Sequence, residues 1–285
     1  MKKKYILLAG ATGYLGRFIA SELHEQDYSA TILVRDKNKF TANFEKFKTI
    51  VTEVTKPEML QGIMNDVDVV ISTIGITKQK DGLTYMDVDY QANLNLLNEA
   101  KKAGVRKFIY VSAFNADRLK HLKIAAAKEK FLDQLKYSGL DYSIISPNGF
   151  FSDMTEFLKM AKKGKAELFG DGNYKMNPIH GKDLAEVCVD AIESDASTIE
   201  IGGPEIFTHK EIAELAANII GKEVKISYIP EWVRRMILWS ARTFTSSKKY
   251  GPLEFFFTVL SMDMVAPSYG EHRLSDFFNE MKTKI

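Results

Sequence analysis

Three glycines near the N-terminus have the spacing of a phosphate-binding turn. The stretch "LLAGATGYLGRFIA" places them between an apolar run and an amphipathic segment. The first glycine permits a sharp turn, the second permits close approach of a diphosphate, and the third permits tight packing of a helix on a strand. A turn of purely structural use is the alternative, but the strand–turn–helix context favours dinucleotide binding. The loop residues predicted to bind the cofactor are Gly10, Thr12, Gly13, Tyr14, Leu15 and Gly16.

The end of the second apolar run indicates which dinucleotide the loop binds. In "LVRDKNK", Arg35 directly follows the run, with Lys37 and Lys39 close by. A guanidinium group matches a phosphate with two parallel hydrogen bonds, so Arg35 favours NADP. In the competing interpretation Asp36 accepts the ribose hydroxyls of NAD, and Arg35 is a solvated surface charge. We therefore expect NADP as the cofactor, with NAD as the open alternative.

Polar residues follow two later apolar runs, "ISTIG" and "YVSAF". Ligands of parallel sheets bind at the carboxyl ends of the strands, so these positions should face the site. A serine at a strand end is about as often only a helix cap or a turn former. The predicted contacts are Ser72, Thr73, Gly75 and Ser112 for the cofactor, and Ala113 and Phe114 for the substrate.

The segment "SPNGFF" ends another apolar run with a proline. Pro147 breaks the strand, and we expect it and Asn148 to contact the cofactor. Phe150 and Phe151 would then lie over the nicotinamide pocket as substrate contacts. A plain strand-to-helix turn with buried phenylalanines is the alternative.

These candidate residues need a scaffold that brings the strand ends together. Through the first half of the chain, short apolar runs alternate with amphipathic helical patterns. The alternation predicts an α/β class fold, a doubly wound parallel sheet of the Rossmann type with helices on both faces. A helix "GKDLAEVCVDAIES" and a returning strand "STIEIGG" should follow, and then a helix whose capping box pairs Thr208 with Glu211.

We expect one compact unit made of a core and a smaller lobe. The Rossmann core takes residues 1–150 and about 177–203. The C-terminal lobe, for substrate or partner, takes about 151–176 and 204–285.

Composition narrows the class of protein and its surroundings. A net charge of +2 in 285 residues is too small for the basic face of a nucleic-acid binder. Cys188 is the only cysteine, which excludes an internal disulfide and fits a reducing compartment. The uncharged run "FFFTVLSM" is too short to span a membrane, and the basic start leads into the glycine loop without a signal cleavage site. We expect a cytoplasmic protein without a metal site, since its histidines lack metal-ligand spacing.

Several stretches resemble the atypical short-chain dehydrogenase/reductase superfamily, in its NmrA-like, NAD(P)H-binding branch. "GATGYLG", "DVVISTIG", "ANLNLLNEAKKAGVRKFIYVSAF" and "FGDGNYKMNPIHGKDLAEVCVDAI" are arranged as in that branch. Within it the chain is most similar to the divinyl reductases of chlorophyll synthesis and their relatives outside photosynthesis. The branch also contains isomerases, redox-sensing regulators and assembly factors, so the resemblance implies the fold and the cofactor rather than a substrate. In the branch's second-half signature, which includes Asp183, a structural role for His180 is favoured over catalysis.

The resemblance also frames the chemistry around "KIAAAKEKF". In members with the full motif, a Tyr four residues before a Lys transfers the substrate proton, and the Lys binds the nicotinamide ribose. Lys128 matches that Lys, but Ile124 stands at the Tyr position and has no ionisable group. This pattern is similar to atypical members that reduce double bonds, which implies that Lys128 binds the cofactor and stabilises the anion left by hydride transfer. A solvated Lys128 on a lysine-rich helix is the alternative.

The C-terminal part is rich in aromatic residues. Residues 228–278 contain 11 of the chain's 32 aromatic residues, including both tryptophans. They could line a pocket for a large, flat or isoprenoid-like ligand. They could also form a membrane-surface or partner patch around "EWVRRMILWSARTF", or pack as a core.

Together these patterns favour an NADP-dependent reductase of the atypical short-chain type, acting on an apolar, conjugated small molecule. The alternative keeps the nucleotide but lacks turnover, as a redox-sensing or assembly protein. A sugar-nucleotide epimerase or dehydratase is disfavoured, because the related enzymes need the missing tyrosine. The sequence does not indicate an oligomeric state.

Overall fold

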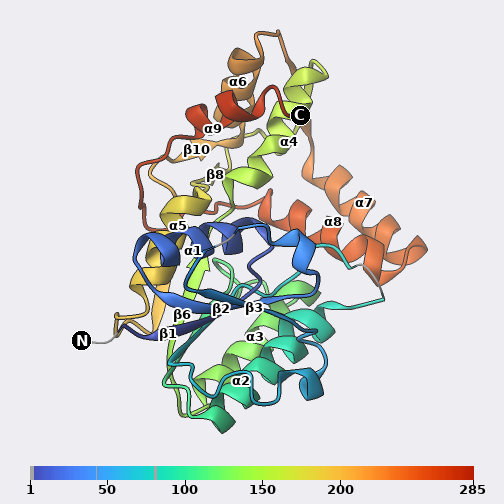
Figure 1. Cartoon of the computed structure of the whole chain (residues 1–285). Coiled ribbons are helices and arrows are strands. Elements are labelled where there is room, and N and C mark those ends of the chain that lie inside the picture. The colour runs from blue at the N-terminus through green and yellow to red at the C-terminus, as the bar shows by residue number, and fades with distance from the viewer. Residues whose placement is uncertain (1–2, 43, 80–81) are drawn as a thin grey trace. The chain divides into compact units, whose positions relative to one another are not determined.

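The first part of the chain forms a parallel sheet with its first strand inside the sheet. The computed structural model describes residues 3–42, 44–79 and 82–285. Within these ranges, seven strands hydrogen-bond in the order β3-β2-β1-β4-β5-β6-β9 (Figure 1). From β1 the chain winds outward in both directions, so the predicted doubly wound Rossmann fold is confirmed. The strands are β1 (Tyr5–Ala9), β2 (Ser29–Val34), β3 (Phe47–Val51), β4 (Val69–Ser72), β5 (Lys107–Val111), β6 (Asp141–Pro147) and β9 (Thr198–Ile201).

Helices cover both faces of this sheet. In Figure 1, α1 (Tyr14–Glu25) lies on one face, and α2 (Asn93–Ala103) and α3 (Lys123–Lys136) lie on the other. Leu7 and Ala9 of β1 belong to the core cluster that includes residues of α2 and α3, together with Tyr110 of β5. Successive side chains of a strand point to opposite faces, so the fully buried Leu8 points toward α1. Shorter helical segments are η1 (Lys37–Lys39), η2 (Pro57–Leu60) and the π-helix η3 (Met86–Ala92).

The chain divides into two compact units and passes between them three times. The first unit comprises Met1–Ser146 and Leu184–Ile199, and the second comprises Pro147–Asp183 and Glu200–Ile285. α5 (Gly181–Asp190) and β9 therefore contribute residues to both units. The predicted return of the chain to the sheet is confirmed, because β9 pairs beside β6. The assignment of the later residues to a substrate or partner lobe stays a prediction.

The second unit packs helices with two small sheets. β7 pairs in parallel with β11, and β8 pairs antiparallel to β10. The predicted capping box is confirmed at the start of α6. The N–H of Glu211 donates to Oγ1 of Thr208 at 3.1 Å, and the N–H of Thr208 donates to Oε2 of Glu211 at 2.7 Å. The elements are α4 (Phe151–Lys162), β7 (Lys165–Phe169), β8 (Lys175–Met176), β10 (Phe207–Thr208), α6 (His209–Ile220), β11 (Lys225–Ile229), α7 (Glu231–Phe244), α8 (Ser247–Val259) and α9 (Leu274–Met281).

The described residues lack a membrane-spanning helix and a cluster of metal ligands. No helix in that part of the chain has both the length and the apolar character needed to cross a bilayer. No three His, Cys, Asp or Glu side chains in the same ranges are grouped as metal ligands. Cys188 is a buried free thiol whose pKa is raised by burial, so it packs as a small apolar side chain.

The capping box gives a test of the fold. Thr208→Ala removes the side-chain acceptor at the start of α6 and should lower the free energy of unfolding by about 1 kcal/mol. Thr243→Ala is the matched control, because Thr243 is exposed and its hydroxyl donates back to a carbonyl within α7. Urea unfolding followed by circular dichroism measures both variants. Equal losses in the two would mean that the box does not stabilise α6.

Candidate functional site

A pocket of the first unit lies where β1 and β4 end. These two strands flank the point at which the strand order reverses, where ligands of doubly wound sheets bind. The pocket has a volume of about 290 Å³, and its walls come from the glycine loop and the segments that follow β2, β3 and β4. The predicted residues that line it are Gly10, Thr12, Gly13, Arg35, Thr73 and Gly75.

The glycine loop is shaped by contacts that leave no room for a Cβ atom. Gly10 has φ of +96°, a conformation that favours glycine, and a Cβ there would lie 2.2 Å from Oγ1 of Thr73. A Cβ on Gly16 would lie 2.1 Å from the carbonyl oxygen of Gly10. Gly13 precedes α1 and has no side chain to accept hydrogen bonds from the N–H groups of the first turn. These N–H groups and the helix dipole suit an anionic ligand.

Tyr14 and Leu15 begin α1, but their side chains do not line the pocket. The Tyr14 ring makes an edge contact with the Phe18 ring, at 5.3 Å between centroids, and Leu15 is buried in the core. Any contact of these two residues with a diphosphate would use their backbone N–H groups. Their role in cofactor binding stays a prediction.

Arg35 directly follows β2, and this exposed residue lines the pocket. Asp36, the competing candidate, caps the N-terminus of η1, where its Oδ1 accepts a hydrogen bond from the N–H of Asn38 at 3.0 Å. Asp36 is not one of the pocket-lining residues. The acidic residue that does line this pocket is Glu53, on the segment after β3. The guanidinium of Arg35 is therefore better placed for a ligand than the carboxylate of Asp36.

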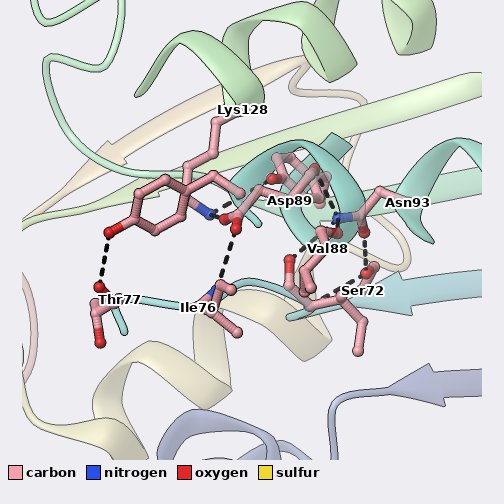
Figure 2. A network of polar contacts seen from close by, with 10 residues as sticks. Ser72, Ile76, Thr77, Val88, Asp89, Asn93 and Lys128 are labelled. Atoms are coloured by element: carbon pink, nitrogen blue, oxygen red, sulfur yellow. Dashed lines mark hydrogen bonds and ion pairs between the residues drawn. The ribbon is translucent and has the colours of Figure 1, made fainter. Parts of the chain in front are cut away.

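Lys128 forms a buried charge pair with an acidic residue of the π-helix (Figure 2). Its Nζ lies 2.9 Å from Oδ1 of Asp89, and the side chains of Lys128 and Asp89 are 12% and 0% exposed. Oδ2 of Asp89 accepts a hydrogen bond from the N–H of Ile76 at 3.2 Å. Among the described residues Oδ1 has no aligned hydrogen bond, so its contact with Lys128 is chiefly electrostatic. Nζ also lies 3.5 Å from the hydroxyl oxygen of Tyr110, a fully buried residue of β5. The interpretation of Lys128 as a solvated surface lysine is wrong.

Burial and charge act against each other in this cluster. Burial tends to lower the pKa of Lys128, but the oxygens of Tyr110 and Asp89 more than offset it, so the pKa lies above its usual value. Burial raises the pKa of Tyr110 to about 12. Burial also raises the pKa of Asp89, and Lys128 and the N–H of Ile76 only partly counter it. The raised pKa of Asp89 favours its neutral form, which would weaken the pair, whereas the raised pKa of Lys128 favours its charged form. The 2.9 Å separation of the two groups favours the state in which both are charged.

Gly75 connects this charge pair to the pocket. A Cβ on Gly75 would lie 2.8 Å from Oδ1 of Asp89 and 2.9 Å from Nζ of Lys128. Gly75 itself lines the pocket, so the ammonium group lies directly behind one residue of its wall. A positive charge fixed there can stabilise negative charge that develops next to it.

Ser72 points into the protein, where it holds the segment after β4 in place (Figure 2). Its hydroxyl donates to Oδ1 of Asn93 at 2.6 Å, and both residues are fully buried. Nδ2 of Asn93 donates to the carbonyl oxygens of Ile74, at 3.1 Å, and Asp89, at 3.0 Å. Asn93 thus joins the pocket wall to the π-helix. Such π-helical segments are frequent at functional sites. Cofactor binding by Ser72 stays a prediction.

The predicted residues after β5 lie mostly inside the first unit. Ser112 is 7% exposed, and in the described part of the chain its hydroxyl has no hydrogen-bond partner. Ala113 is half-buried, and Phe114 is buried. A buried hydroxyl without a partner is a candidate for ligand contact, so the cofactor role of Ser112 remains a reasonable prediction.

The remaining predicted residues belong to the second unit. Pro147 ends β6, and Nδ2 of Asn148 donates to Oδ1 of Asn177 at 2.8 Å and to the carbonyl of Met264. Phe150 precedes α4, and the buried Phe151 packs its ring against His180. The side chain of Asn148 is therefore used within the unit, and ligand contacts of these residues stay predictions.

His180 and Asp183 lie in one cluster of the second unit. The rings of His180 and His272 stack at 4.3 Å between centroids, and Nδ1 of His272 lies 2.5 Å from Oδ1 of Asp183. Burial lowers the pKa of His180, which keeps the imidazole neutral at pH 7. These contacts support a structural role for His180, the alternative that the sequence favours over catalysis.

Several residues of the site were not found by sequence reasoning. The acid that pairs with Lys128 stands within "VDYQAN", a stretch that gives no sign that the carboxylate is buried. Tyr110 lies in an apolar strand, where an aromatic residue normally indicates core packing. The segment after β3 follows an edge strand with a weak apolar signal. The pocket residues that sequence reasoning missed include the polar side chains Thr52, Glu53, Thr55 and Lys78.

Comparison with known proteins agrees with this geometry. A divinyl chlorophyllide a 8-vinyl-reductase of Arabidopsis thaliana is 27% identical over 96% of this chain and 75% of its own. The photosystem II assembly factor Ycf39 of a Synechocystis strain is 29% identical over 84% of this chain and 74% of its own. In the solved structure of the NADPH-dependent quinone oxidoreductase QOR2 from Escherichia coli, with NADPH, 99% of that chain matches 97% of this one with a TM-score of 0.76 and 17% identity, a likeness in fold.

A family model described as NAD(P)H-binding matches residues 10–195. The match starts at the first glycine of the loop and contains all residues of the charge pair, so it covers the pocket of the first unit. The chain belongs to this NAD(P)H-binding family, in agreement with the resemblance to atypical short-chain dehydrogenases/reductases.

Proposed function

We propose that the protein is an NADP(H)-dependent reductase acting on an apolar, conjugated small molecule. The observation that carries this proposal is the buried ammonium group of Lys128 behind Gly75, at the wall of the pocket that the glycine loop forms. Reduction of a conjugated bond generates an anion, and a fixed cation in a dehydrated place stabilises such an anion. The cation is present here without the motif tyrosine that alcohol oxidation would need, because Ile124 stands at that position.

The pocket residues fit a dinucleotide in two respects. Gly10 and Gly16 exclude side-chain atoms, so the turn packs tightly and directs backbone N–H groups toward an anion. Arg35 supplies a positive charge on the wall that follows β2. When bound, the cofactor supplies the hydride, and the chain's own residues bind it and prepare the acceptor.

The preference for NADP rests on the residues after β2. A 2′-phosphate carries negative charge that Arg35 can neutralise with paired hydrogen bonds. Lys37 and Lys39 are exposed on η1 close by in the sequence and add to the positive potential. Asp36 uses one carboxylate oxygen to cap η1, which weakens the case for ribose recognition by that residue.

Lys128 acts in this proposal as a fixed cation and not as a proton donor. Hydride addition to one carbon of a conjugated carbonyl moves an electron pair onto the carbonyl oxygen. The ammonium group stabilises that oxygen, while Asp89 and the raised pKa of Lys128 keep the proton on Nζ. Water then supplies the proton that completes the reduction, so the product gains one hydride and one proton.

A second candidate keeps the nucleotide but has no turnover. The 29% identity to a protein named as a photosystem II assembly factor supports it, because that name describes assembly and not catalysis. In this alternative the bound nucleotide would stabilise the first unit, and the buried charge pair would be structural. Turnover with any electron-poor alkene or quinone separates the two candidates.

Cofactor preference is tested at Arg35. Arg35→Ala should weaken NADPH binding by about ten- to a hundred-fold, because a charge-assisted contact worth about 1.5–3 kcal/mol is lost. NADH binding should change less than about three-fold, since NADH lacks the phosphate. Fluorescence titration of both nucleotides measures the change, with the exposed Arg118→Ala as the matched control. Unchanged NADPH preference would show that Arg35 does not recognise the phosphate.

The catalytic role is tested at Lys128. With a panel of enones and quinones, Lys128→Met should reduce NADPH oxidation by at least about a hundred-fold, because one electrostatic stabiliser contributes about 2.7–4 kcal/mol. The variant also leaves Asp89 unpaired and should lose about 3–5 kcal/mol of unfolding free energy. The absorbance of the reduced cofactor and urea unfolding measure the two effects.

A double variant separates catalysis from stability. Lys128→Met with Asp89→Leu removes both charges and should recover much of the lost stability while remaining inactive. Lys130→Met is the control on the same helix, since Lys130 lies over the Tyr90 ring and outside the charge pair. Recovery of turnover in the double variant would contradict a catalytic role for Lys128. Binding of NADPH by the unmodified protein, with no oxidation on any substrate, would favour the assembly alternative.

A further inference from the structure

Helix α7 presents aromatic side chains to solvent. Trp232 is 66% exposed, Trp239 is 64% exposed and Phe244 is 76% exposed, and Met236 between the tryptophans is exposed as well. Leu238 is the residue of this helix that is buried. Aromatic residues exposed in series to this extent are unusual for a soluble surface, since their burial would contribute free energy. The core-packing explanation of the C-terminal aromatic residues therefore does not apply to these side chains.

Three of the four exposed apolar side chains, Trp232, Met236 and Trp239, share one face of the helix, and Phe244 lies outside it. With about 100° per residue, Trp232, Met236 and Trp239 fall within an arc of about 60°. On the same measure Arg235 and Arg242 lie at one margin of this arc, and both are exposed. An apolar stripe bordered by arginines is the pattern of a helix that lies in the plane of a membrane surface. Arg235 can reach outward from this margin to headgroups, whereas Arg242 is paired with Glu254.

The charge of this segment differs from that of the rest of the chain. Residues 230–250 contain five basic residues and one acidic residue, a net charge of +4, whereas the whole chain has +2. The acidic residue, Glu231, accepts a hydrogen bond from Nε of Arg234 at 2.8 Å, which leaves the positive charges in excess. Arg242 pairs with the buried Glu254 of α8 and so fixes α7 against its neighbour. An anionic surface complements this charge.

We propose that the exposed face of α7 docks on an anionic lipid surface, with Trp232, Met236 and Trp239 inserted at the headgroup level. The tryptophan side chain suits that level because it combines a large apolar ring with a hydrogen-bond donor. Lipid is favoured over a second copy of this chain, since two such positively charged segments would repel each other. The inference does not depend on the proposed reductase activity.

The chain carries its own reporter for this contact. Trp232 and Trp239 are its two tryptophans, so tryptophan emission reports on this face alone. Adding vesicles of phosphatidylcholine with phosphatidylglycerol to the full-length protein should shift the emission to the blue. Brominated lipid should quench it, and vesicles of phosphatidylcholine alone should give little change. The shift should decrease at high ionic strength, because salt screens the attraction.

Matched variants test the geometry while keeping both tryptophans. Met236→Glu, in the middle of the face, and Arg235→Glu, at its margin, should each weaken vesicle binding by about ten-fold or more. Tyr137→Glu is the control, because Tyr137 is 90% exposed on the first unit and should bind vesicles like the original protein. Circular dichroism and NADPH titration confirm that each variant is folded.

Three outcomes would overturn the proposal. One is the absence of a shift with anionic vesicles while the protein is folded. Another is an equal shift with neutral vesicles, which would remove the role of charge. The third is a blue shift that depends on protein concentration without vesicles, together with a dimer in sedimentation, which would assign the face to a second copy. None of these results bears on whether the first unit reduces a substrate.

Discussion

A charge pair buried beneath the sheet edge is the constraint on which the site depends. Asp89 is inaccessible to solvent, and Lys128 is nearly so, and neither charge would be tolerated there without the other. Their contact also limits the loop above them, because any side chain on Gly75 would meet both groups. One electrostatic interaction therefore couples α3, the π-helix and the pocket wall.

Two parts of the pocket wall, the glycine loop and Gly75, are held in place in different ways. At the glycine loop, backbone atoms of β1, α1 and the β4 end approach so closely that only hydrogen fits between them. Behind Gly75, a buried cation is held, against the cost of its desolvation, by a partner of opposite sign. Asn93 joins the two, since its amide donates to the loop after β4 and to the carbonyl of Asp89. A ligand in the pocket would meet the backbone of the glycine loop and, at Gly75, a wall with the charge pair behind it.

Local spacing explains which parts could be predicted from the sequence. The glycine loop and the position of Arg35 follow from short motifs, the doubly wound fold follows from the alternation of apolar runs and helical patterns, and the capping box at Thr208 follows from its spacing to Glu211. The partner of Lys128 could not be predicted, because Asp89 lies far away in the sequence and within a π-helix, whose wider turn breaks the helical period. Ser72 stands at a strand end, as expected from the sequence. Its side chain, however, points to Asn93 in the interior and not into the pocket. The direction of a side chain at a strand end depends on which face of the sheet it occupies, and a place at the strand end does not determine that face.

The three passages between the units make neither of them a continuous piece of sequence. The last strand of the sheet, β9, is synthesised after residues 147–183 of the second unit. During synthesis β6 must therefore wait as an unpaired sheet edge until β9 arrives, and unpaired edges invite association with other chains. A fragment that ends at residue 183 would keep the glycine loop, but β6 would remain an unpaired, aggregation-prone sheet edge. Exchanging the second unit between relatives thus requires three joints rather than one, with residues 184–199 kept from the parent of the sheet.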